Sequence, residues 1–235
     1  EDGISLNGEW YFLCESSPEQ VPGEFYKERY DVSGWEKIFV PSCWETKGYG
    51  VPWYFGAGFP SAISTSKKKI PAIDHEKTYT GAYRRSFSVP DKWQGKQVIL
   101  RFGSVKSAFY CWINGTYVGM GKGSMLPVEF DVTRLVRSGE NTVSVKVYQF
   151  SDATYLEDQD MWFMSGIYRD VALYARSKAH IADIYAKSEL DGEYQDAKLY
   201  VEVRTENVTL KNATPKSVAV DGETAMTEKV ADGEC

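Results

Sequence analysis

A series of short runs rich in β-branched and aromatic residues, each ended by Gly, Pro, Asn or Asp, most constrains the fold of this chain. Such runs predict strands. Asn114-Gly115 lies between two of them and is a strong β-hairpin signal, because a type I′ turn needs positive φ at both central residues. Val143, Val145 and Val147 alternate with polar residues, which predicts a strand with one buried face. The predicted strands are Ala82–Val89, Gln97–Phe102, Ala108–Ile113, Tyr117–Gly119, Asn141–Tyr148 and Arg169–Tyr174.

The pattern predicts an all-β chain with two domains. The series of predicted strands is interrupted near Ala175–Ala179, and two further strands are expected at His180–Tyr185 and Lys198–Arg204. We therefore place a first domain, a β-sandwich, at residues 1–177 and a second domain at residues 178–235. A complete β-sandwich needs about 100 residues, so the second is predicted to be a β-sandwich that is only partly present.

Charge and composition exclude several classes of protein. The net charge of −6 at pH 7 argues against general binding to nucleic acid, which requires a basic surface to neutralise phosphates. No apolar run approaches the ~18 residues that a membrane helix needs. The four Cys residues have neither the spacing of a zinc pair nor a CxxC motif, and the chain has only two His residues. We therefore expect no nucleic acid, no membrane and no nitrogen–sulfur metal site.

An acidic and aromatic run at Tyr155–Asp170 is the first candidate for a ligand site. The run is too polar for an ordinary strand, and it places Glu157, Asp158 and Asp160 beside Trp162. Carboxylates accept hydrogen bonds from hydroxyl groups, and aromatic faces cover the apolar faces of a sugar ring. The run is suited to a polyhydroxylated ligand, with a solvated acidic loop as the alternative.

The second candidate region is the Gly- and Pro-rich stretch Gly48–Tyr79, which is expected to be a loop. Loops of this length are uncommon in compact domains unless they serve a function. Its aromatic residues either cover the core or line a site, and covering is favoured for most of them. These residues are Tyr49, Trp53, Tyr54, Phe55 and Phe59.

Several sequence blocks, taken in order, resemble the N-terminal part of glycoside hydrolase family 2 enzymes. No single block is decisive, but their order and spacing over residues 4–175, and more weakly over 176–204, argue against chance agreement. The LEDQDMW block is similar to the large bacterial β-galactosidase branch, and less so to the glucuronidase and mannosidase branches. The blocks are Leu6–Phe12, Val40–Trp44, Gly81–Phe87, Trp112–Gly115, Leu156–Trp162 and Ser165–Val171.

The resemblance implies a jelly-roll, galactose-binding-like β-sandwich, followed by an immunoglobulin-like β-sandwich that is truncated here and then by a TIM barrel. Family members carry both catalytic Glu residues in the barrel and use the retaining mechanism with a covalent glycosyl intermediate. The chain stops before a barrel could begin, so the resemblance implies no catalytic residue in this segment. We expect it to be inactive alone and to complete the substrate pocket of a parent enzyme that hydrolyses terminal β-D-galactosides.

The resemblance also implies a role for Asp160. In the family pattern the second Asp of DQDMW accepts hydrogen bonds from galactose hydroxyls and helps to hold a sodium ion. Asp160 is therefore the expected substrate and metal ligand, and sodium the expected cofactor of the full-length enzyme, with none bound tightly by this segment. Gly56 stands where close relatives carry an Asn that contacts the sugar, which makes Trp53 or Phe55 the candidate for an aromatic contact there.

Other residues near these motifs are expected to be structural. Glu157, Asp158 and Trp162 are secondary candidates for ligand binding, but Trp162 is expected in the core rather than against a ligand. Arg84, Arg85 and Arg169 are expected to pair with acidic residues such as Asp170, because the guanidinium group suits bidentate carboxylate pairing.

Two alternatives to the pocket-completing role stay open: an independent carbohydrate-binding module with its own aromatic platform, and a structural domain that stabilises oligomer contacts. The expected partners are the chain's own catalytic barrel, a β-galactoside and, in the full-length enzyme, further copies of the chain. The acidic start without Met favours a periplasmic or secreted location over a cytoplasmic one.

Overall fold

The computed structural model describes residues 2–55, 70–157, 160–207, 218–220 and 223–225. These residues form strands and short 3₁₀-helices, and none of them lies in an α-helix. The all-β class predicted from the sequence is therefore confirmed. The chain divides into two compact units, Glu1–Arg176 and Ser177–Cys235. In the part of the chain that is described, no helix has the length and apolar character needed to cross a membrane.

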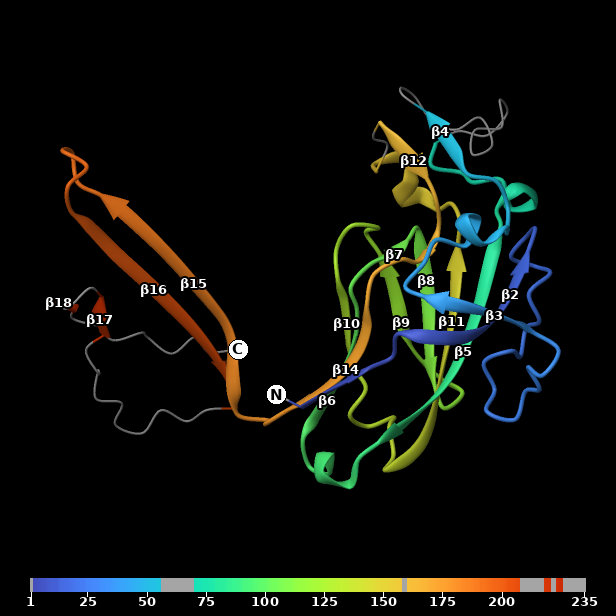
Figure 1. The fold of residues 1–235 in the computed structure, drawn as a ribbon, viewed down its shortest axis with the longest axis horizontal. Coiled ribbons are helices and arrows are strands. Elements are labelled where there is room, and N and C mark those ends of the chain that lie inside the picture. The colour runs from blue at the N-terminus through green and yellow to red at the C-terminus, as the bar shows by residue number, and fades with distance from the viewer. Residues whose placement is uncertain (1, 56–69, 158–159, 208–217, 221–222, 226–235) are drawn as a thin grey trace. The chain divides into compact units, whose positions relative to one another are not determined.

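Two antiparallel sheets form a sandwich in the first unit (Figure 1). The larger sheet has the strand order β3-β2-β5-β11-β8-β9, and the smaller has the order β1-β14-β6-β10. The strands of the larger sheet are β2 (Gly8–Glu15), β3 (Glu36–Val40), β5 (Thr80–Val89), β8 (Ala108–Ile113), β9 (Thr116–Lys122) and β11 (Gly139–Tyr148). Those of the smaller sheet are β1 (Asp2–Ser5), β6 (Gln97–Phe102), β10 (Val128–Asp131) and β14 (Val171–Arg176).

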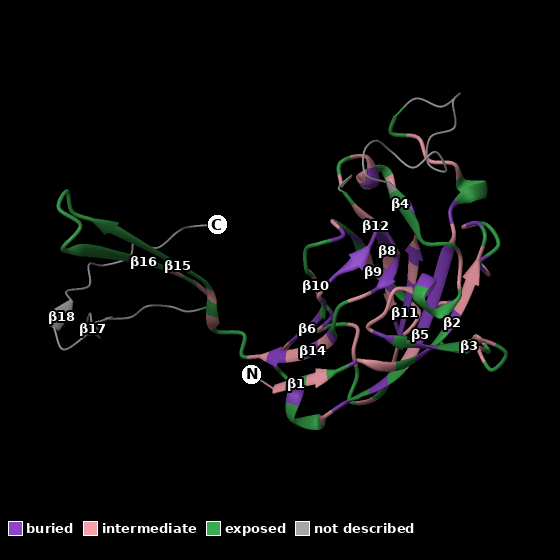
Figure 2. Ribbon diagram, turned by 45° about the horizontal axis from the view of Figure 1, so that its top comes forward, coloured by how far each residue is buried: buried purple, intermediate pink, exposed green. Residues whose placement is uncertain are grey.

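The core lies between the two sheets, because alternate side chains of each strand point inward. Val143, Val145 and Val147 of β11 are all fully buried, which confirms the alternation predicted for this strand. Leu100 of β6 and Leu173 of β14, from the other sheet, belong to the same buried cluster. Figure 2 shows long buried stretches in β5, β8 and β11.

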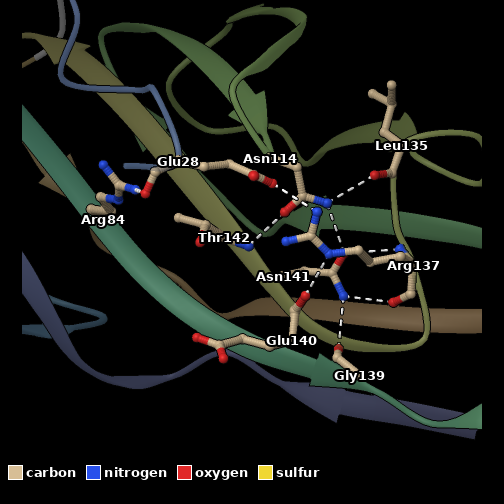
Figure 3. Close-up of polar contacts among 9 residues, drawn as sticks. All are labelled: Glu28, Arg84, Asn114, Leu135, Arg137, Gly139, Glu140, Asn141 and Thr142. Atoms are coloured by element: carbon tan, nitrogen blue, oxygen red, sulfur yellow. Dashed lines mark hydrogen bonds and ion pairs between the residues drawn. The ribbon is translucent and has the colours of Figure 1, made fainter. Parts of the chain in front are cut away.

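The predicted turn at Asn114-Gly115 joins β8 to β9, with φ of 50° at Asn114 and 77° at Gly115. The Asn114 side chain also holds the turn against the start of β11 (Figure 3). Its amide nitrogen donates to the Leu135 carbonyl and to Oδ1 of Asn141, and its own Oδ1 accepts from the backbone N–H of Thr142. Backbone and side chain therefore fix this end of the sheet together.

The residues between β2 and β3, numbers 16–35, form what we call the covering segment, which packs on the outer face of the six-stranded sheet. Val21 and Phe25 are buried in one cluster with Ala82 of β5. Trp112 of β8 packs on the same cluster, with its ring 5.4 Å from that of Phe25. The segment thus covers the outer face around Ala82 and Trp112.

Arg84 of β5 fastens the covering segment to the sheet. The residue is only 5% exposed, and its guanidinium group donates to the backbone carbonyls of Phe25, Glu28 and Tyr30 (Figure 3 shows the contact with Glu28). Burial lowers its pKa from the ordinary value, although the Glu28 carboxylate opposes this effect. The three carbonyls satisfy a charge that the fold has removed from water.

The expectation that the three candidate arginines pair with carboxylates is therefore wrong for their main contacts. Arg85 donates to the carbonyl of Asn7, and Arg169 donates to the carbonyl of Met125. Asp170 instead accepts from the side-chain amide of Asn7. The reason is that irregular segments lie over these strands and present unpaired carbonyls, which a guanidinium fork can bind several at a time.

Two short ribbons complete the first unit, and the residues of the β7–β13 ribbon are buried. Strand β4 (Trp53–Phe55) pairs with β12 (Met161–Phe163), and β7 (Val105–Lys106) pairs with β13 (Gly166–Ile167). The expectation that Gly48–Tyr79 is a loop throughout is wrong at β4, and the polar run after Tyr155 contains a strand at β12. The 3₁₀-helices are η1 (Trp44–Lys47), η2 (His75–Lys77), η3 (Asp91–Trp93) and η4 (Asp152–Tyr155).

The described part of the second unit consists of two hairpins, β15 (His180–Leu190) with β16 (Ala197–Glu206), and β17 (Val218–Val220) with β18 (Glu223–Ala225). Both strands predicted for this region are present. Tyr185 of β15 and Leu199 of β16 are 60% and 57% exposed, and the hairpin is coloured almost wholly as exposed in Figure 2. A two-stranded ribbon has too little apolar surface to bury. Its assignment to an immunoglobulin-like sandwich stays a prediction.

Candidate functional site

The candidate site is built on the β4–β12 ribbon, which brings together the two regions singled out in the sequence. Trp53 pairs with Phe163, and Tyr54 pairs with Trp162, across an antiparallel register. Side chains directly opposite on such a ribbon lie close enough to contact one another. The acidic run and the aromatic stretch therefore share one small structure, which we call the β4–β12 edge.

Asp160 stands immediately before β12 and is exposed. Its Oδ1 accepts a hydrogen bond of 2.5 Å from the hydroxyl of Tyr54. This bond, together with the charge of the carboxylate, raises the pKa of Tyr54 from its ordinary value, so the phenol stays protonated and continues to donate. The contact orients the carboxylate while leaving it accessible to solvent.

Three aromatic side chains of the ribbon are partly exposed. Trp53 is 37% exposed, Tyr54 is 53% exposed and Trp162 is 54% exposed. The rings of Tyr54 and Trp162 lie 5.5 Å apart at 52°. The expectation that Trp162 belongs to the core is wrong, and Trp53 and Tyr54 are not among the aromatic residues that are buried over the core. A two-stranded ribbon offers no second layer to bury its outer face.

Apart from Glu157, the other aromatic and acidic residues singled out in the sequence either cover the core or have side chains outside the described part of the chain. Tyr49 does cover the core, because its ring packs 4.9 Å from that of Phe12. Phe55 forms part of β4, but its side chain lies outside the described residues, as do Gly56, Phe59 and Asp158.

Glu157, a secondary candidate for ligand binding, is already engaged within the chain. Its carboxylate accepts from the backbone N–H of Ser124 at 2.7 Å and from the hydroxyl of the same residue at 2.5 Å. Ser124 is fully buried. Glu157 therefore anchors the segment that leads to Asp160, and the predicted role in binding a ligand is not supported.

Sequence reasoning missed Lys106, which lies beneath the ribbon. Its ammonium group is 4.7 Å from the centre of the Phe163 ring, and the residue is only 5% exposed. Among the described residues its Nζ has no hydrogen-bond partner. Burial lowers its pKa, and the nearby Glu157 carboxylate opposes this effect. No local signal marks this residue, because Lys106 sits in an ordinary strand-like run.

Glu45 of η1, also missed, fixes the exit from the ribbon. It is 7% exposed, and its Oε2 accepts from the backbone N–H of Ser165 at 2.8 Å. Burial raises the pKa of this carboxyl group, and the bond from Ser165 opposes the rise. A backbone bond from Trp44 to the Ser165 carbonyl, of 3.0 Å, holds the same two segments. The start and the end of the acidic run are thus both tied to the sandwich.

The arrangement presents one oriented carboxylate beside the exposed ring pair of Tyr54 and Trp162. Within the described ranges, no group of three or more His, Cys, Asp or Glu side chains is placed to hold a metal ion. Asp160 could supply a single oxygen ligand and hydrogen-bond acceptance to a hydroxyl group, and the rings could cover an apolar face. These are the capabilities of a ligand-positioning edge.

The fold and this edge define a β-sandwich domain suited to contacting a polyhydroxylated ligand. Residues 4–177 match the family model described as "Glycosyl hydrolases family 2, sugar binding domain". The chain therefore belongs to glycoside hydrolase family 2, and the resemblance drawn from its sequence blocks is confirmed.

Relatives with assigned names are similar to this chain over only part of their own length. A β-galactosidase of Priestia megaterium is 40% identical over 197 residues, covering 84% of this chain and 19% of that protein. A β-galactosidase of Alteromonas mediterranea is 38% identical over 231 residues, covering 97% of this chain and 21% of that protein. The chain thus spans about a fifth of the length of these relatives.

Solved structures show the same fold. A β-glucuronidase from an uncultured Clostridium species has a TM-score of 0.65 and 26% identity, with 88% of this chain and 34% of that chain covered. A Bacteroides uniformis β-glucuronidase has a TM-score of 0.64 and 24% identity, with 85% and 21% covered. Sequence identity is thus higher to the named β-galactosidases than to these glucuronidases.

Proposed function

We propose that this chain is the non-catalytic N-terminal part of a retaining β-galactosidase, and that it completes the substrate pocket of a catalytic TIM barrel. The observation that carries the proposal is the β4–β12 edge, where an exposed carboxylate and exposed rings are gathered from segments far apart in the chain. The β-galactosidase relatives, at about 40% identity, support the substrate class.

In this proposal Asp160 accepts hydrogen bonds from galactose hydroxyls. Tyr54 holds the carboxylate in place through its hydroxyl, and Trp53 contributes an apolar face to the sugar ring. Phe55 stays a predicted contact. Because the carboxylate is charged, each hydroxyl bond it accepts contributes about 1.5–3 kcal/mol when water is excluded by the bound substrate.

A sodium ion is part of the same proposal. Asp160 offers a hard carboxylate oxygen, which suits an alkali cation, but the described residues form no group of three or more His, Cys, Asp or Glu side chains that could hold an ion by itself. The other ligands would come from the barrel or from water. The ion would add a fixed positive charge to which sugar hydroxyl oxygens can coordinate.

The test is hydrolysis of a chromogenic β-galactoside by the full-length parent, with Asp160→Ala compared against Glu9→Ala across sodium concentrations. Glu9 is an exposed carboxylate on β2 that forms only a surface ion pair with Lys37, so its removal should change little. We expect Asp160→Ala to lower kcat/KM by roughly 10- to 100-fold and to remove the sodium response.

Two outcomes would contradict the proposal. Equal kinetics for the two variants would leave Asp160 outside the substrate pocket. Hydrolysis by this chain alone would show that it is not the non-catalytic part of the enzyme.

A further inference from the structure

A groove of about 570 Å³ opens on the outer face of the six-stranded sheet, over β8, β9 and β11. The covering segment stops short of this area, and its residue Glu19 forms one wall. His75 of η2 and Asp152 of η4 stand on other sides. The volume lies within the roughly 300–1,000 Å³ typical of small-molecule sites. None of the residues of the β4–β12 edge lines it.

The floor of the groove is aromatic and partly exposed. Tyr110 of β8 and Tyr148 of β11 lie 5.7 Å apart with their rings perpendicular, so they present surfaces in two directions. Met120 of β9 pairs with Tyr110 in the sheet register and is 45% exposed. Tyrosine combines an apolar ring with a hydroxyl group, which suits a ligand that has both apolar faces and polar edges.

The formal charges around the groove balance when His75 is neutral, because Lys122 and Lys146 are offset by Glu19 and Asp152. Lys122 and Asp152 form an ion pair of 2.8 Å, and His75 and Glu19 lie 3.2 Å apart. Lys146 donates to the Pro18 carbonyl at 2.8 Å and lies 5.6 Å from the centre of the Tyr148 ring. An anion or a cation would find no surplus of opposite charge here.

This combination selects a ligand that is neutral and rich in hydroxyl groups. Hydroxyls donate and accept, so they can bond with the acidic and the basic groups of the lining, and the CH faces of a pyranose ring can lie on the tyrosines. We propose that the groove binds a neutral oligosaccharide, as a sugar site formed by residues other than those of the β4–β12 edge. The ligand class follows from the groove alone and does not depend on the galactosidase proposal.

The test is an NMR titration of the isotope-labelled chain with two neutral probes, β-1,4-galactotetraose and cellotetraose, and with trigalacturonate as an anionic control. We expect shifts concentrated at Tyr110, Met120 and Tyr148, with a Kd of about 1 mM or tighter for at least one neutral probe and no comparable effect of the anion. Tyr110→Ala should weaken binding at least about tenfold. Tyr200→Ala, which removes an exposed tyrosine of β16 outside the groove, is the matched control.

The mapping on the unsubstituted chain decides the question even if Tyr110→Ala does not fold, and Met120→Ala then serves as the second variant. Absence of shifts at about 10 mM of both neutral probes, or shifts located elsewhere, overturns the proposal. Groove shifts that depend on protein concentration rather than on sugar would assign the surface to a second copy, and also overturn it. In Asp160→Ala the groove shifts should persist, which separates this test from that of the proposed function.

Discussion

Removing the guanidinium group of Arg84 should release the covering segment from the sheet. Arg84→Met keeps the buried stem but deletes the three hydrogen bonds to the carbonyls of Phe25, Glu28 and Tyr30. At the lower end of the roughly 1.5–3 kcal/mol for a bond from a charged donor, the three are worth about 4–5 kcal/mol. The variant no longer has to remove a charge from water on folding, which offsets part of this loss, so we expect the free energy of unfolding to fall by about 3 kcal/mol.

The assay is urea unfolding of the chain followed by tryptophan fluorescence, with hydrogen exchange measured across residues 16–35. Arg134→Met is the control, because Arg134 is exposed, and we expect its effect to stay within about 0.5 kcal/mol. A loss below about 1 kcal/mol for Arg84→Met, with unchanged exchange in the covering segment, would refute the reasoning. It would mean that the aromatic cluster around Phe25 holds the segment without help from the guanidinium group.

Three further perturbations test other parts of the structure. Lys106→Met should raise the free energy of unfolding at pH 7, because burial lowers the pKa of Lys106 and the folded chain therefore disfavours its charged form. This advantage of the variant should shrink as the pH rises toward about 10.4, where the lysine of the unfolded chain also loses its proton. Urea unfolding at several pH values measures both effects. Gly81→Ala would place a Cβ 2.7 Å from the Trp44 ring and should lower the free energy of unfolding by about 1–3 kcal/mol, whereas Gly34→Ala, with nothing within 4 Å, should change it little in the same measurement. Tyr54→Phe keeps the ring but removes the bond to Asp160, so in the full-length parent it should lower kcat/KM less than Asp160→Ala does; an equal or greater loss would contradict a purely orienting role.

The parts of the fold that depend on neighbouring residues in the chain could be predicted from the sequence. The three valines of β11 and the Asn114-Gly115 turn are encoded by alternation and by backbone conformation, which are local properties. Gln97–Phe102 and Ala108–Ile113 are strands with the predicted bounds. Asp160 could be singled out because it lies in the LEDQDMW block, which resembles a family motif.

The parts that depend on distant contacts could not be read in this way. Strands β4 and β12 are each three residues long and form because they pair across 106 residues of sequence, so neither has a period of its own. The burial of Lys106 and Glu45 is likewise set by the segments that fold over them. The acceptors of Arg84 are backbone carbonyls, which are the same in every residue and leave no trace in the sequence.

The β4–β12 edge has a consequence for engineering and for evolutionary exchange among relatives. The carboxylate of Asp160, just before one strand, is oriented by a phenol on the other strand, and the two strands are encoded in separate parts of the gene. Transplanting the LEDQDMW block alone into a related enzyme would carry the acid without the strand that aligns it. Chimeras should therefore keep full activity only when both segments come from the same parent, so a crossover between residues 55 and 161 would be a poor place to join two sequences.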